Sequence, residues 1–172
     1  MWKKILIGLA IVLGLVVVGG LVLPDSYSVS RSTTVAVAPD SLQPLLEDLL
    51  LWRTWAPWEH MDSTIVTTMG AITRGLDAEQ SWIDKSGGGR LKITVCQPGR
   101  VEYDVWFGKN PAPIHSILTA VPEGAGCRVD WSMAGEMDMP VVGPYFAMLA
   151  DRMIGPMFQQ GLDSLKAVVE RK

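Results

Sequence analysis

The sequence is poor in the residues that build metal centres and disulfide scaffolds. It has two cysteines and two histidines among 172 residues. No pair of them has the H-x-x-H, H-E-x-x-H or His-Cys spacing that holds a metal ion. Two cysteines are also too few for a fold that depends on several disulfide bonds for stability. We therefore expect no metal and no cofactor.

Positive charge is scarce as well. The chain carries 15 Lys and Arg against 18 Asp and Glu, a net charge of −3, and its sequence pI is about 5.3. Proteins that bind nucleic acid need a basic surface to neutralise phosphates. The composition therefore predicts no nucleic-acid partner.

Catalytic motifs are equally sparse. There is no G-x-S-x-G nucleophile elbow, and residues 86–89 (SGGG) lack the Gly-Lys-Ser/Thr ending of a phosphate-binding loop. His60 and His115 are each a possible general base, but single histidines of this kind are more typical of surface positions. We assign no catalytic residue, and the sequence leans against an enzyme.

One long hydrophobic run is present, and it accounts for much of the chain's mean hydropathy of +0.23. Nineteen residues from Ile5 to Leu23 include no charge and no proline, with Lys3 and Lys4 before them and Pro24 and Asp25 after. As a helix this run is about 28 Å long, close to the roughly 30 Å hydrocarbon layer of a bilayer. We predict a single-pass anchor over residues 1–23 in the cytoplasmic (inner) membrane. The preceding lysines place the rest of the chain on the extracytoplasmic side.

A cleaved signal peptide is the alternative to this anchor. Signal peptides have apolar regions of about 7–15 residues that end in a small-x-small cleavage site. Here the run is longer, and residues 19–24 (GGLVLP) offer only a poor site after Gly20. We therefore favour an uncleaved anchor.

Residues 24–172 then form one domain of 149 residues, with 13 basic and 18 acidic side chains and a net charge of −5. The pattern predicts a strand at 27–37, a helix from Pro39 through Leu50, and a short helix or turn at 52–58. Short strands closed by turn signals follow at 64–69, 78–84, 90–96, 101–107, 114–121 and 127–133. Several of the turns are hairpin-sized, so an antiparallel meander is expected.

The last segment, residues 145–170, is predicted to be a helix with two apolar stripes. Phe158, Leu162, Leu165 and Val169 form one stripe, while Phe146, Leu149 and Met153 form the other. Residues 155–156 (Gly-Pro) between them are expected to kink or interrupt the helix. One sheet and one long helix bury their apolar faces only against each other. The fold class is therefore α+β, a curved antiparallel sheet of about seven strands around a C-terminal helix.

Alternation along the strands separates an apolar face from a polar one. The apolar set comprises Leu91, Ile93, Val95, Val101, Tyr103, Val105, Phe107, Cys127, Val129, Trp131 and Met133. Cys96 falls on the polar set and Cys127 on the apolar set, so the two thiols should point apart and remain unbridged.

Methionine is concentrated near the end of the domain, with six of the nine methionines between positions 133 and 157. Such a surface adapts to varied apolar partners, so these residues either line an apolar cavity or simply fill the core. On the cavity interpretation, the candidate ligand-binding residues are Trp82, Tyr103, Val105, Leu118, Val129, Trp131, Met133, Met153 and Met157.

Three segments resemble the SRPBCC superfamily, the START-like, polyketide cyclase/dehydrase and lipid-transport proteins, in its membrane-anchored bacterial form. Residues 50–59 are similar to its "W-x-x-W-x-P-W" segment, and residues 126–135 to its "G-T-x-V-x-W-x-x-x-G" last strand, with Cys127 where Thr is usual. Residues 153–166 are similar to its closing helix, and Gly75, Trp82 and Gly89 fit its middle region loosely. The resemblance covers residues 26–170.

This resemblance implies the helix-grip fold, in which the sheet and the C-terminal helix enclose a cavity. Similar proteins bind lipids, sterols, polyketides or quinones, and a minority catalyse cyclisation or dehydration without a catalytic set common to all. The first hypothesis is therefore a membrane-tethered domain that binds a hydrophobic or amphipathic small molecule such as a lipid. The alternatives are a cyclase or dehydratase using a carboxylate, His60 or His115, and an envelope interaction module with exposed Trp55 and Trp106.

Overall fold

The fold was analysed in a computed structural model, which describes residues 2–58, 64–85 and 87–171. An N-terminal helix, α1 (Trp2–Val22), precedes the first strand. The elements that follow are β1 (Ser26–Val35), α2 (Pro39–Glu47), α3 (Leu49–Trp52), β2 (Val66–Met69), β3 (Glu79–Ile83), β4 (Gly89–Gln97), β5 (Arg100–Phe107), β6 (Ile114–Glu123), β7 (Gly126–Glu136) and α5 (Gly143–Val169).

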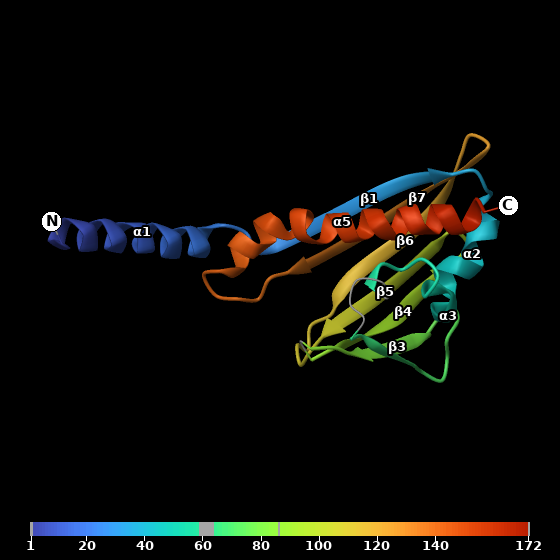
Figure 1. Cartoon of the computed structure of the whole chain (residues 1–172), viewed down its shortest axis with the longest axis horizontal. Coiled ribbons are helices and arrows are strands. Elements are labelled where there is room, and N and C mark those ends of the chain that lie inside the picture. Colours follow the sequence, from blue (N-terminus) through green and yellow to red (C-terminus); the bar gives the residue numbers. More distant parts are fainter. Residues whose placement is uncertain (1, 59–63, 86, 172) are drawn as a thin grey trace.

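The seven strands form one antiparallel sheet in the order β1-β7-β6-β5-β4-β3-β2. Strands β2 to β7 are a meander of neighbouring pairs, and β1 joins the sheet beside β7. The long helix α5 lies across the inner face of the sheet, mainly over β1, while α2 and α3 cover the end away from α1 (Figure 1). The α+β helix-grip fold predicted from the sequence is confirmed.

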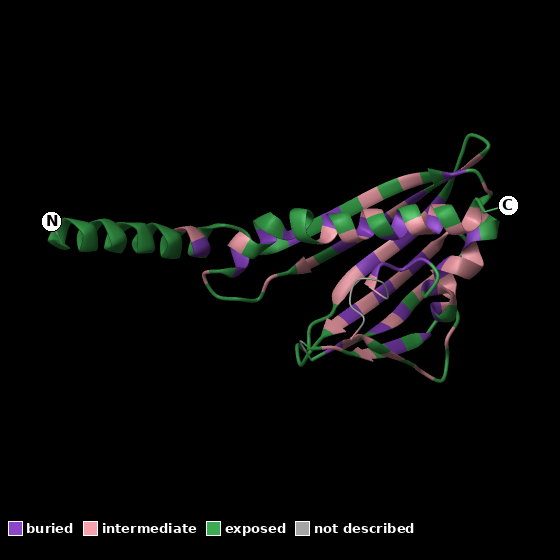
Figure 2. Ribbon diagram, viewed as in Figure 1, coloured by how far each residue is buried: buried purple, intermediate pink, exposed green. Residues whose placement is uncertain are grey.

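Most inner-face residues of the central strands are buried, and their neighbours along each strand are more exposed (Figure 2). In β5, for example, Val101, Tyr103 and Val105 are buried, whereas Glu102 and Asp104 between them are partly exposed. This period of two is what a sheet with one solvated face requires. It places the hydrophobic core between the sheet, α5 and the α2–α3 pair.

The predicted face of two residues in β4 is wrong. The register of β4 against β5 shifts between Ile93 and Val95, so that Val95 pairs with Glu102 and Cys96 pairs with the buried Val101. This irregularity adds one residue and exchanges the faces of everything after it. Cys96 therefore packs against the core, although both Cys96 and Cys127 are free thiols.

The predicted interruption of the last helix does not occur, since α5 runs through Gly155 and Pro156 as one helix of 27 residues. The guanidinium of Arg31 from β1 lies where a Cβ on Gly155 would stand, so β1 and α5 approach each other closely at this position. Here glycine serves close packing against β1 rather than a break in the helix.

Helix α1 is exposed along most of its length (Figure 2) and is long and apolar enough to cross a membrane. A signal sequence near the N-terminus would have the same properties. Helix α1 therefore meets the length and composition requirements of either kind of segment.

Candidate functional site

Trp131 of β7 lies at the centre of a group of rings on the inner face of the sheet. Phe158 of α5 stacks on it with ring centroids 4.3 Å apart and planes within 3° of parallel. Trp55 and Trp58 meet it edge to face at 5.5 and 5.9 Å. Trp52, which also contacts the rings of Trp55 and Trp58, meets Tyr103 at 5.1 Å. We call these six residues the aromatic cluster: Trp52, Trp55, Trp58, Tyr103, Trp131 and Phe158.

Two indole hydrogen bonds fix the segment that follows α2. Nε1 of Trp52 donates to the carbonyl of Leu46, and Nε1 of Trp55 donates to the carbonyl of Leu45, each at 3.0 Å. A buried indole N–H needs such a partner. Trp52 and Trp55 are thereby held in the core, and Trp58 is the half-buried ring at the edge of the cluster.

Two members of the cluster, Tyr103 and Trp131, share hydrogen bonds with each other and with the neighbouring Ser116. Nε1 of Trp131 donates to the hydroxyl of Tyr103 at 2.8 Å and to the hydroxyl of Ser116 at 3.2 Å. The Ser116 hydroxyl in turn donates to the carbonyl of Ser132 at 2.8 Å. We refer to Tyr103, Ser116 and Trp131 as the polar trio.

Burial raises the pKa of the Tyr103 phenol well above its ordinary value, and hydrogen bonds with Ser116 and Trp131 offset only part of that rise. Tyr103 therefore stays protonated at every physiological pH. In this state it can give a hydrogen bond to an oxygen of a bound molecule, but it is not available as a general base.

The predicted ligand-binding residues divide between the core and the surface. Tyr103, Val105, Leu118, Val129, Trp131 and Met133 are buried on the inner face of the sheet, while Met157 and Trp82 are half-buried. Met153 is wrongly assigned to the interior, because it lies on the solvent side of α5 and is 58% exposed. A helical stripe by itself does not say whether it faces the core or the outside.

Sequence reasoning left four members of this site out of the predicted set: Trp52, Trp55, Trp58 and Phe158. Trp55 was expected to be exposed and is fully buried, because it lies three residues after Trp52 and the two point toward the same side. The W-x-x-W-x-P-W spacing at 52–58 is the signal that finds the three tryptophans, whereas Phe158 belongs to the apolar stripe of the last helix. Ser116 was also missed, since a single serine in a strand carries no pattern.

Trp82 lies apart from the cluster, in an open hollow of about 550 Å³ at the β3–β4 and β5–β6 turns. Its ring meets Phe107 edge to face at 5.6 Å, and its Nε1 donates to Asp84 at 3.2 Å. Arg90 and Trp106 also line this hollow, and the Arg90 guanidinium lies 3.8 Å from the centroid of the Trp106 ring.

A smaller hollow of about 370 Å³ lies between α2 and the β4–β5 turn, and neither hollow is lined by a residue of α5. Burial and a hydrogen bond to Glu47 raise the pKa of the Cys96 thiol in this smaller hollow. Cys96 is therefore a poor nucleophile.

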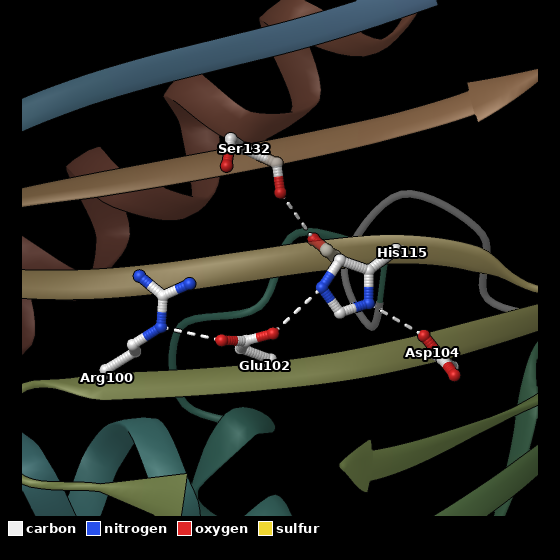
Figure 3. A network of polar contacts seen from close by, with 6 residues as sticks. Arg100, Glu102, Asp104, His115 and Ser132 are labelled. Carbon is white, nitrogen blue, oxygen red and sulfur yellow. Dashed lines mark hydrogen bonds and ion pairs between the residues drawn. The ribbon is translucent and has the colours of Figure 1, made fainter. Parts of the chain in front are cut away.

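His115 lies on the outer face of the sheet, with the carboxylates of Glu102 and Asp104 on either side of its ring (Figure 3). Its Nδ1 is 2.8 Å from Asp104 and its Nε2 is 3.0 Å from Glu102. A hydrogen bond from Arg100 and a weaker one from His115 lower the pKa of Glu102. This charged group and the aromatic cluster lie on opposite sides of the sheet, so His115 cannot act on a molecule bound inside. His60, the other histidine, lies outside the described residues.

Comparison with known proteins agrees with this geometry. The profile of the family described as polyketide cyclase / dehydrase and lipid transport matches residues 26–170. The comparison with curated proteins returned no match.

Several solved structures share the fold at low sequence identity. Protein CV1439 from Chromobacterium violaceum is 14% identical, with a TM-score of 0.61 over 84% of this chain and 98% of its own. A protein from Thermobifida fusca is 21% identical, with a TM-score of 0.59 over 81% of this chain and 90% of its own. Ara h 8.0201 is 10% identical, with a TM-score of 0.52 over 83% of this chain and 99% of its own. The chain therefore belongs to the polyketide cyclase/dehydrase and lipid-transport family of the SRPBCC superfamily.

Proposed function

We propose that this protein is a membrane-tethered domain that binds a hydrophobic or amphipathic small molecule between the sheet and α5. The ligand has an apolar body and at least one hydrogen-bond acceptor, such as a hydroxyl, carbonyl or ester oxygen. The observation that carries the proposal is the polar trio, which joins Ser116 to Tyr103 and Trp131 of the aromatic cluster. Ligand sites commonly combine an apolar lining with a few placed polar groups.

The aromatic cluster fills this space with its own rings, so binding requires one of them to move. Trp58 is suited to do so, because it is half-buried and its partners are Trp52 and Trp131. Giving up two ring pairs costs about 1–3 kcal/mol. Burial of about 200 Å² of apolar ligand surface returns roughly 5 kcal/mol. Because Trp58 also exposes part of its own buried surface when it moves, the ligand has to cover at least that much apolar area for the exchange to be favourable.

Tethering supports the same function. With α1 in the inner membrane and residues 24–172 on the extracytoplasmic side, the domain stays next to the phase in which apolar ligands collect. A short tether raises the effective concentration of such a ligand at the binding site without any new contact.

Photo-crosslinking in membranes tests the proposal. The full-length chain is expressed with Trp58→p-benzoylphenylalanine, irradiated in native membranes and analysed by intact mass. We expect an adduct with a small apolar molecule. Tyr103→Phe in the same background should reduce its yield, because the ligand loses its hydrogen-bond donor.

Trp106 supplies the matched control, since it is also a half-buried tryptophan but lies on the outer face beneath Arg90. The same probe at position 106 should give no such adduct. Equal labelling at 58 and 106, or no adduct at 58, would contradict an internal binding site.

A further inference from the structure

The start of α5 presents a stripe of large apolar side chains that the rest of the described chain leaves more than two-fifths exposed. Val142, Phe146 and Leu149, spaced four and three residues apart, are 45%, 42% and 45% exposed. On the adjacent side of the same turns, the small residues Ala147 and Ala150 are buried. A surface helix usually points its large apolar side chains toward the core and its polar ones outward. This half of α5 does the reverse.

The same end of α5 lies against the last turns of α1. The hydroxyl of Tyr145 donates to the backbone carbonyl of Val16 at 2.8 Å. The carbonyl of Val141 lies where a Cβ on Gly20 would stand, and the Tyr145 hydroxyl lies where one on Gly19 would. Figure 1 shows the loop before α5 at the same end of the molecule as α1. Two glycines thus let the chain before α5 pack directly on the apolar helix.

Val141 itself has an unusual backbone, with φ of 66°. A β-branched residue in the left-handed region is strained, and such strain persists only where the surroundings impose it. The contact with Gly20 is one such constraint.

The depth of this contact follows from helix geometry. Val16 precedes Leu23, the last residue of the apolar run, by seven residues, or about 10 Å along the helix axis. In a spanning α1, Tyr145 therefore reaches into the outer part of the hydrocarbon layer, where its hydroxyl needs the partner that Val16 supplies. Val142 and Phe146, within one helical turn of Tyr145, lie at nearly the same level.

We propose that Val142, Phe146 and Leu149, with the preceding Met139, are embedded in the phospholipid leaflet from which the domain emerges. The apolar stripe is thus a second membrane contact beside α1, and it fixes the orientation of the domain on the bilayer. An apolar helix face typically enters the boundary between headgroups and acyl chains by about 5–10 Å. This inference rests on the proposed tethering by α1.

Depth measurement by spin labelling tests it in the full-length chain, reconstituted in vesicles of phosphatidylethanolamine and phosphatidylglycerol. Phe146→Cys and Leu149→Cys variants are labelled with a nitroxide, and collision rates are measured with oxygen and with a water-soluble nickel chelate. Burial raises the pKa of both native thiols, Cys96 and Cys127, so they label slowly. The unvaried chain, labelled in parallel, gives the background.

Two reference positions calibrate the depth. Leu15→Cys places the label on the exposed surface of α1, and Ile83→Cys places it on an exposed apolar side chain of β3. We expect the ratio of nickel to oxygen collisions at 146 and 149 to be several-fold lower than at 83 and close to the ratio at 15.

The outcomes separate the two proposals. A lipid-like ratio at 15 with a water-like ratio at 146 and 149 would overturn the embedded stripe and leave the tether intact. A water-like ratio at 15 would overturn the tether, and the embedded stripe with it. Strong dipolar broadening between labels at 146 would indicate that a second copy of the chain covers the stripe, and it would also overturn lipid contact.

Discussion

The two halves of α5 belong to one continuous helix but differ in the direction of their large apolar side chains. In the C-terminal half, Phe158, Leu162 and Leu165 are buried against the sheet and the aromatic cluster. In the N-terminal half, the buried side consists of small residues such as Ala147 and Ala150, and the large apolar side chains point outward. If the embedded stripe proposed above is correct, both apolar faces of α5 are removed from water, the C-terminal one by the protein core and the N-terminal one by lipid.

The strongest test of this contrast compares two phenylalanines on the same helix. Phe158→Ala removes a ring stacked on Trp131 and should destabilise the folded domain by about 3–5 kcal/mol, as expected for a large cavity in a core. Phe146→Ala removes an exposed ring and should change the free energy of unfolding by less than about 0.5 kcal/mol. Urea unfolding of the two variants in the same detergent, followed by tryptophan fluorescence, gives both values.

Equal losses of stability in the two variants would break the contrast, because they would mean that the N-terminal half is also packed by its outward stripe. Phe158→Leu serves as the control for ring loss, and it should recover part of the stability by refilling the space.

A smaller effect concerns the polar attachment of the N-terminal half to β1. Arg31 donates to the carboxylate of Asp151 at 2.7 and 3.0 Å, and this hydrogen bond lowers the pKa of Asp151 in the folded chain. A lowered carboxyl pKa stabilises the fold above the pKa of the unfolded state, about 3.9. That contribution is lost as the pH falls through the folded pKa.

Asp151→Asn should therefore be less stable than the parent chain at neutral pH, and the difference should vanish in acid. Unfolding curves measured across a pH series give the difference directly. The difference should also disappear in an Arg31→Gln background, in which the partner is absent. A difference that persists unchanged at low pH would mean that Asp151 acts through packing instead of charge.

The smallest expected effect concerns Tyr27, on the inner face of β1. Its hydroxyl is the one buried side-chain polar atom without a hydrogen-bond partner among the described residues. Tyr27→Phe removes an unpaired polar group and keeps the ring, so stability should stay unchanged or rise by up to about 1 kcal/mol. A clear loss in thermal unfolding would show that the hydroxyl has a partner, such as a bound water.

Much of the fold follows from the sequence because it depends on local patterns. Alternation in residues 101–107 gave the faces of β5, and the run from Ile5 to Leu23 gave the bounds of α1 to within a few residues. The faces of Val95 and Cys96 could not be predicted. They depend on an irregularity in the pairing of β4 with β5, which is a property of two strands together.

The candidate site was predicted in part for the same reason. Tyr103 and Trp131 alternate with polar residues, so their inward direction was visible in the strands. The inward position of Trp55 and the pairing of Phe158 with Trp131 depend on how α3 and α5 dock on the sheet. Met153 was assigned to the cavity and is exposed. Helical spacing shows which residues share a side of α5, but it does not show which side faces the core.

What the sequence alone determined is an apolar N-terminal helix, a seven-stranded α+β domain of the SRPBCC type, and a chain short of metal ligands and basic charge. These properties depend on composition, periodicity and short motifs. The tertiary structure decided that six rings fill the space between the sheet and α5, and that His115 lies on the other side. It also decided that half of α5 carries its large apolar side chains outward beside α1. The reason is physical: periodicity fixes which residues share a face, but only packing against other elements decides what that face meets.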